Sequence, residues 1–141
     1  MYSKVLVPVD LSHGEVGERI VAVARQLAGS TGSLVLLTVL ESIPGYVAHA
    51  IPADVLERNR AAARQNLDSL AKKAGGSVTV TLREGKPSHE ILEEAEASGC
   101  DCIVLGSHRP DLSDYLLGST AARVVRHAGC SVLVDRTLVA G

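Results

Sequence analysis

The sequence has no tryptophan and no phenylalanine, and three tyrosines are the only aromatic side chains among its 141 residues. Because 46% of the residues are nevertheless hydrophobic, the interior must be built from Val, Leu, Ile and Ala. Such a mixture is typical of buried parallel strands covered by helices. A chain of this length forms one domain with a sizeable core, so we expect a single domain over residues 1–141 that needs neither disulfides nor metals.

Cysteine, net charge and long apolar segments are scarce as well. The three cysteines include a Cys-Asp-Cys at 100–102, which lacks the spacing of a redox pair or a zinc site, so we interpret them as small buried hydrophobic residues. The formal net charge is −2 without a predicted basic face, which argues against nucleic acid as a partner. No apolar run reaches the roughly 18 residues that span a bilayer, and the N-terminus leads into a predicted strand, so we expect a cytoplasmic protein without membrane contact.

Short aliphatic runs alternate with apolar stripes of helical period along the whole chain. The runs predict five strands, at residues 4–9, 33–39, 77–82, 102–105 and 131–134. The stripes between them begin at Val16, Ala63, Ile91 and Ala121. Boundary signals agree, with a capping box at 12–15, Pro87 opening a helix, and glycines at 29, 75, 76 and 129 ending helices. We therefore predict an α/β fold in which right-handed crossovers build a parallel sheet with helices on both faces.

The longest irregular piece, Glu41–Ile51, follows the second predicted strand. It must lie at the carboxyl edge of the sheet, where ligands of such folds bind. Two interpretations stay open at this point, a lid over a ligand or an ordinary mobile loop.

The segment Gly106–Thr120 has the layout of an anion cradle. A glycine that ends a strand permits a turn with positive φ and a close approach of ligand, and Gly118-Ser119-Thr120 opens a helix whose N–H groups point outward. Phosphate suits such a site. The segment has no lysine, which excludes a Walker-type phosphate loop. Asp10, at the tip of the first strand, either accepts hydrogen bonds from ribose hydroxyls or caps its own turn.

At these residues the chain resembles the universal stress protein family over essentially its whole length. The opening Lys-Val-Leu-Val-Pro-Val-Asp, the Gly106–Thr120 segment and the closing Cys130–Val134 carry the resemblance. It implies a five-stranded parallel sheet of order 3-2-1-4-5 with a Rossmann-like, adenine nucleotide alpha hydrolase-like fold. In nucleotide-binding members a Gly-x2-Gly-x9-Gly-[Ser/Thr] segment wraps the phosphates of ATP.

Carried over by position, Gly106, Gly118, Ser119 and Thr120 match that pattern. Asp10 matches the family's ribose-contacting aspartate, and Val39 sits where the backbone would meet adenine. The predicted cofactor-binding site is completed by the neighbouring residues Pro8, Val9, Ser107, His108 and Arg109.

The chain departs from the pattern in two ways. Arg109 followed by Pro110 replaces the second glycine, and the outer glycines are one residue closer together than in the family pattern. This form resembles the branch called the F and G type. Arg109 either replaces a lost N–H contact with a charge-assisted bond to phosphate oxygens or pairs with Asp111 or Asp114.

The resemblance implies a cytosolic ATP-binding stress-response regulator that acts through nucleotide occupancy, with or without magnesium. Hydrolysis would be slow or absent, so no catalytic or metal-binding residue is assigned. The last strand, Ser131–Val134, is an apolar edge through which we expect a homodimer. Two alternatives stay open: a slow ATP hydrolase or phosphotransferase in which His108 positions water, and a nucleotide-free dimeric scaffold whose site is filled by Arg109 and Pro110.

Overall fold

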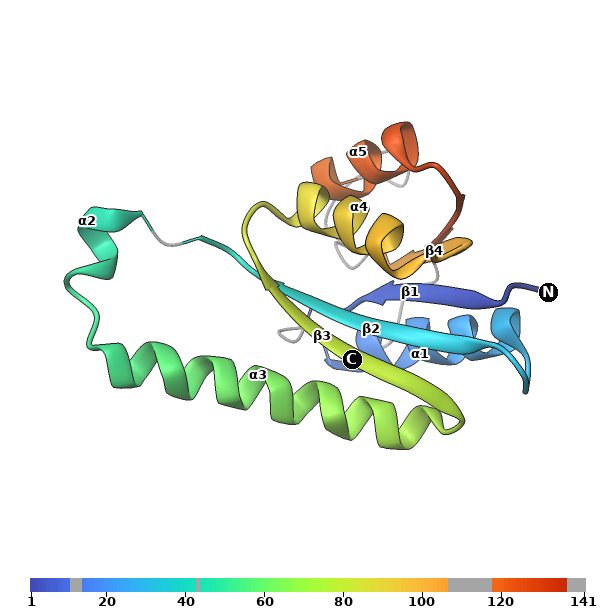
Figure 1. Cartoon of the computed structure of the whole chain (residues 1–141), viewed down its shortest axis with the longest axis horizontal. Coiled ribbons are helices and arrows are strands. Elements are labelled where there is room, and N and C mark those ends of the chain that lie inside the picture. The colour runs from blue at the N-terminus through green and yellow to red at the C-terminus, as the bar shows by residue number, and fades with distance from the viewer. Residues whose placement is uncertain (11–13, 43, 107–117, 137–141) are drawn as a thin grey trace.

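The computed structural model describes residues 1–10, 14–42, 44–106 and 118–136, and within them an alternating α/β chain. In chain order the elements are β1 (Lys4–Pro8), α1 (Gly14–Ala28), β2 (Ser33–Leu40), α2 (Gly45–Ala48), α3 (Ala53–Ala74), β3 (Ser77–Glu84), α4 (Pro87–Ser98), β4 (Cys102–Gly106), α5 (Ser119–His127) and β5 (Ser131–Asp135). The strands form one parallel sheet of order β3-β2-β1-β4-β5 (Figure 1). The predicted topology is therefore confirmed.

Helices cover both faces of the sheet and bury two aliphatic cores. On one face α1 and α3 pack over a cluster that includes Val7, Leu36 and Leu67. On the other face α4 and α5 pack over a cluster that includes Leu37, Ile103 and Val124 (Figure 1). Because β1, β2 and β4 are buried on both faces, they read as nearly continuous aliphatic runs in the sequence.

The backbone pairing between the two central strands ends before their carboxyl ends. The ladder between β1 and β4 contains only the pairs Val5 with Cys102 and Leu6 with Ile103, whereas β1 stays paired with β2 as far as Pro8. The N–H of Val9 donates to β2, so the alternate position Pro8 has its nitrogen on the β4 side. A proline is tolerated there because no partner strand requires its missing N–H.

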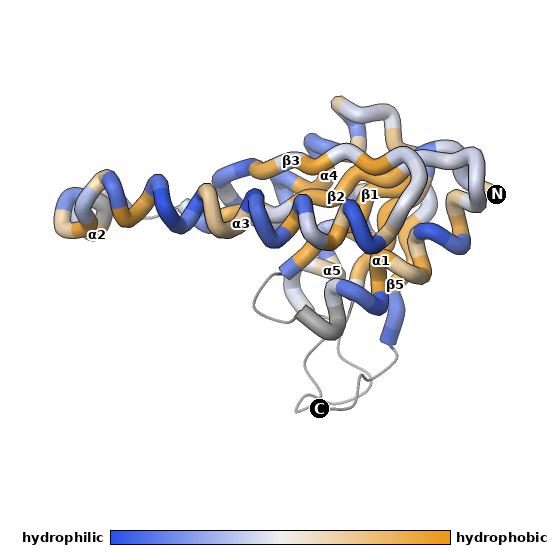
Figure 2. The backbone as a smooth tube through the Cα atoms, turned by 90° about the horizontal axis from the view of Figure 1, so that it is seen from below, coloured by the Kyte–Doolittle hydropathy of each residue, from blue (hydrophilic) through white to orange (hydrophobic). Residues whose placement is uncertain are grey.

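The region after β2 differs from the sequence-based expectation. Within the predicted irregular piece 41–51 lies the one-turn helix α2, and α3 begins at Ala53, ten residues before the apolar stripe at Ala63. The first ten residues of α3 contain no buried side chain. Figure 2 shows this half of α3 and α2 extending beyond the sheet.

The predicted helix ends that fall on described residues are confirmed. Pro87 occupies the first turn of α4, Gly75 follows α3 with φ of 68°, and Gly29 follows α1 with φ of 72°. Residues 12 and 13 of the predicted capping box lie outside the description. In the described part of the chain, no helix has the length and apolar character needed to cross a membrane.

Candidate functional site

The sheet brings most of the predicted site residues to one edge. Pro8, Val9 and Asp10 end or follow β1, Val39 is the penultimate residue of β2, and Gly106 is the last residue of β4. Parallel strands share their carboxyl edge, so these residues lie along the same side of the sheet. Ser107, His108 and Arg109 belong to the segment 107–117, which the structure does not describe, and their predicted phosphate contacts stay predictions.

The tip of β1 is fastened to β2 by two hydrogen bonds. The N–H of Val9 donates to the carbonyl of Leu37 at 2.7 Å, and the hydroxyl of Thr38 donates to the carbonyl of Val9 at 3.0 Å. Val9 and Thr38 are only 5% and 6% exposed, whereas Asp10, the next residue, is exposed. Sequence reasoning missed Thr38. The available signal was a hydroxyl residue inside the aliphatic part of the strand, directly before Val39.

The first turn of α5 has the predicted orientation of amides. Gly118 is its N-cap residue with φ of −61° and ψ of 157°, and its carbonyl accepts the N–H of Ala122 at 2.9 Å. The N–H groups of Ser119, Thr120 and Ala121 precede that bond, so helix geometry gives them no acceptor inside the helix. The end of a helix that carries such groups favours an anion.

The backbone of Gly106 differs from the positive-φ turn that we predicted for it. Gly106 pairs with Asp135 of β5 and is still part of a strand, so a positive-φ turn does not begin there. At Gly118 the backbone is one that any residue adopts, and a Cβ atom would meet nothing within 4 Å. Neither conformation nor packing of the described protein therefore explains a glycine at 118, whereas the close approach of a ligand would explain it.

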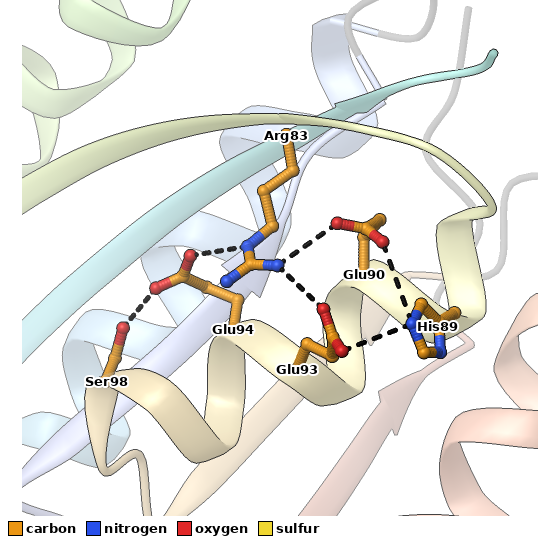
Figure 3. Close-up of polar contacts among 6 residues, drawn as sticks. All are labelled: Arg83, His89, Glu90, Glu93, Glu94 and Ser98. Carbon is orange, nitrogen blue, oxygen red and sulfur yellow. Dashed lines mark hydrogen bonds and ion pairs between the residues drawn. The ribbon is translucent and has the colours of Figure 1, made fainter.

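A charged cluster joins β3 to α4 near the same edge. Arg83, the register partner of Val39, donates to Glu94 at 2.8 Å, to Glu90 at 3.1 Å and to Glu93 at 3.2 Å (Figure 3). Hydrogen bonding to Glu94 is the largest influence that raises the pKa of Arg83. His89, Glu90 and Glu93 come within the reach of a shared metal ion, but both carboxylates already accept hydrogen bonds from Arg83. We assign the cluster a structural role.

Two other features of the described residues do not form a binding site. A depression of about 320 Å³ between α1 and α3 is lined by Val21 and Leu70 and bordered by an ion pair between Glu18 and Lys73 at 2.8 Å, away from the strand ends. The three cysteines are free thiols. Burial raises the pKa of Cys100 and Cys102 to about 11, which keeps both protonated at neutral pH and supports their interpretation as small hydrophobic residues.

A parallel sheet that reverses its direction of winding between β1 and β4, with helix α5 beginning at the same edge as the carboxyl ends of these strands, defines a doubly wound α/β protein. The model of the universal stress protein family matches residues 1–136, and the chain belongs to that family.

Individual relatives agree with this assignment. Universal stress protein G of Shigella flexneri is 34% identical, over 96% of this chain and 100% of that protein. Among solved structures, the hypothetical protein MJ0577 has a TM-score of 0.81 at 25% identity and covers 100% of this chain and 99% of its own. A universal stress protein in complex with cAMP has a TM-score of 0.70 at 26% identity, covering 96% of this chain and 98% of its own.

Proposed function

We propose that this universal stress protein binds an adenine nucleotide, ATP in particular, at the carboxyl ends of β1 and β4. The arrangement of these ends carries the proposal, because Asp10 and Gly106 lie beyond the last pair of the β1–β4 ladder, at the edge of the sheet where α5 begins. Asp10 and the backbone of Val39 would hold the nucleoside. Gly118, Ser119 and Thr120 would hold phosphates through main-chain amides and hydroxyls. The structural relative in complex with cAMP supports adenine as the base.

In this proposal the protein acts through whether its site is occupied by nucleotide. Bound nucleotide would favour one conformation or partner during a stress response in the cytoplasm, with hydrolysis slow or absent. Among the described residues at the strand ends, Asp10 is the one carboxylate of the predicted site, so magnesium would be held mainly by the phosphates and water.

Calorimetry tests the binding directly. ATP, AMP and cAMP are titrated into the protein with and without magnesium, after denatured fresh protein has been checked for released nucleotide. Gly118→Val places a branched side chain before the amides of α5, and we expect it to weaken ATP binding about tenfold or more. Gly129→Val is the matched control, because a Cβ there also meets nothing within 4 Å but lies at the other end of α5. Absence of nucleotide uptake by the unmodified protein, or equal binding by both variants, contradicts the proposal.

We also propose that the protein forms a homodimer through β5. This strand lies at the edge of the sheet, pairs with β4 on one side, and is largely aliphatic from Val132 to Val134. An edge of this kind can pair with a second copy. Light scattering should give twice the chain mass, and amide exchange across Ser131–Asp135 should slow as protein concentration rises. A monomer at every concentration contradicts this part of the proposal.

A further inference from the structure

The last residues of β1 are held by one neighbouring strand only. The pairing of β1 with β4 ends at Leu6, and Pro8 cannot donate a hydrogen bond toward β4. Between Leu6 and Asp10, the strand contacts that fix the backbone of β1 therefore come from β2. The backbone that leads into Asp10, the predicted ribose ligand, is therefore held by β2.

At Val9, a side chain of β2 takes over from the backbone as the hydrogen-bond partner of β1. The ladder between β1 and β2 ends with Pro8 beside Leu37, followed by the bond from the Val9 N–H to the Leu37 carbonyl at 2.7 Å. The next hydrogen bond between the two strands comes from the hydroxyl of Thr38 to the Val9 carbonyl at 3.0 Å, in a buried setting. The Val9 carbonyl and the Asp10 N–H belong to one planar peptide unit, so fixing the carbonyl fixes the plane from which Asp10 extends.

The side chain of Val9 packs against helix α1. In α1, Gly17 lies so close that a Cβ built there would be 3.2 Å from Cγ1 of Val9. Val9 is therefore packed against α1 through its side chain and bonded to β2 through both of its backbone polar groups. Of these contacts, the bond from Thr38 acts directly on the peptide unit of Asp10.

We propose that Thr38 is a positioning residue for the nucleoside, which holds the Val9–Asp10 peptide so that the carboxylate of Asp10 faces the ribose hydroxyls. The inference rests on the proposed binding of adenine nucleotide. Thr38 also directly precedes Val39, whose backbone would contact adenine. The same strand would therefore position both the residue that contacts the base and the residue that contacts the ribose. Loss of the hydroxyl should then affect recognition of ribose more than recognition of adenine or phosphate.

The test compares ATP with 2′,3′-dideoxy-ATP, which lacks both ribose hydroxyls that Asp10 could bind. Dissociation constants for both ligands are measured by calorimetry on the unmodified protein and on Thr38→Val, Thr38→Ala and Thr38→Ser. Valine keeps the shape but puts a methyl group against the Val9 carbonyl, whereas alanine removes the hydroxyl without that contact. Serine keeps the donor. Thr79→Val is the matched control, because it makes the same chemical change at an exposed position of the edge strand β3.

The unmodified protein should prefer ATP over the dideoxy analogue by about tenfold or more, the range of hydrogen bonds to a charged group. We expect this preference to fall to less than about threefold in the valine and alanine variants and to persist in Thr38→Ser and Thr79→Val. A purely structural role of Thr38 would lower the folded fraction and weaken both ligands equally, which leaves the ratio unchanged. Should the valine variant fail to fold, the alanine variant decides.

The outcomes separate the inference from the proposed function. If the unmodified protein prefers ATP and the Thr38 variants keep that preference, the positioning role is wrong while nucleotide binding stands. If Asp10→Ala abolishes the preference and Thr38→Val has no further effect on it in that background, the two residues act through the same contact, as the inference requires. If the unmodified protein binds neither ligand, the proposed function fails and the inference fails with it.

Discussion

At the scale of single residues, one arginine joins two turns at the amino edge of the sheet, opposite the proposed site. Arg25 donates to the carbonyls of Gly29 and Gly32 at 3.2 and 3.0 Å, after α1. It also donates to the carbonyls of Gly75 and Ser77 at 2.6 and 3.3 Å, after α3. The guanidinium therefore gives hydrogen-bond donors to backbone carbonyls in both connections, the one from α1 to β2 and the one from α3 to β3.

Arg25→Ala should lower the free energy of unfolding by about 1–3 kcal/mol, because a charged group that serves four carbonyls is lost. Arg58→Ala is the matched control. Arg58 is 74% exposed and pairs with Asp54 one turn away on α3, so its loss should cost no more than about 0.5 kcal/mol. Urea unfolding of the three proteins measures the difference, and equal midpoints for both variants would show that Arg25 does not join the turns.

The predicted site shows which residues a sequence reveals on its own. Asp10 and Gly118 could be located because they flank recognisable apolar patterns, whereas Val39 was assigned through the family resemblance. The structure places Asp10 after β1, Val39 near the end of β2 and Gly118 directly before α5. Thr38 was missed, because its proposed role arises from a hydrogen bond to Val9, 29 residues away in the chain, and a single hydroxyl in a strand does not reveal that contact. The backbone of Gly106 was misjudged since its pairing with Asp135 continues the strand, a non-local effect.

At the scale of elements, the buried parts were predictable and the exposed part was not. Strands and helix ends follow from aliphatic runs and glycines, which local chemistry determines. The start of α3 does not, because no apolar stripe marks residues 53–62, and their helix depends on good helix formers and on the pair between Asp54 and Arg58 at 3.4 Å. Hydrophobic periodicity reports burial, so it misses a stretch of helix that buries no side chain fully.

The hydrogen bonds of Arg83 join β3 to α4, and their contribution to stability can be measured. Glu94 is 10% exposed in its side chain and also accepts a hydrogen bond from Ser98, whereas Glu93 is 53% exposed (Figure 3). Glu94→Gln keeps the shape but leaves a partly buried guanidinium with a weaker partner, and it should cost about 1–3 kcal/mol of unfolding free energy. Glu93→Gln, the matched control, should change it by no more than about 0.5 kcal/mol. Thermal or urea unfolding measures both, and a larger loss for Glu93 would contradict this assignment.

At the scale of the whole molecule, hydrogen bonds join the two central strands at their amino ends. At the amino end, the carboxylate of Asp101 accepts the N–H groups of Ser3 and Lys4 at 2.9 and 3.1 Å, and its own N–H donates to the carbonyl of Lys4 at 3.0 Å. At the carboxyl end the ladder between the same strands stops after Leu6. The backbone pairing of β1 with β4 therefore lies toward the end of the sheet away from the proposed site.

The amino-terminal tie should make stability depend on pH. Hydrogen bonds from the backbone of Ser3, above all, lower the pKa of Asp101 in the folded protein. A carboxyl group with a lowered folded pKa contributes stability above its unfolded pKa, about 3.9, and loses that contribution as pH falls through the lower folded value. Asp101→Asn should therefore cost about 1 kcal/mol at pH 7, and the difference from the unmodified protein should shrink below about pH 4.

Urea unfolding of both proteins between pH 7 and pH 3 measures this difference, and comparing the two proteins cancels the titration of the other acids. Asp68→Asn is the matched control, because Asp68 is exposed on α3 and should give a small, nearly constant difference over the same range. Because Asp101 ties the ends of β1 and β4 that lie opposite the proposed site, Asp101→Asn should leave the preference for ATP over its dideoxy analogue unchanged. A difference that stays constant or widens toward pH 3 would mean that the ionised carboxylate does not hold the two strands together.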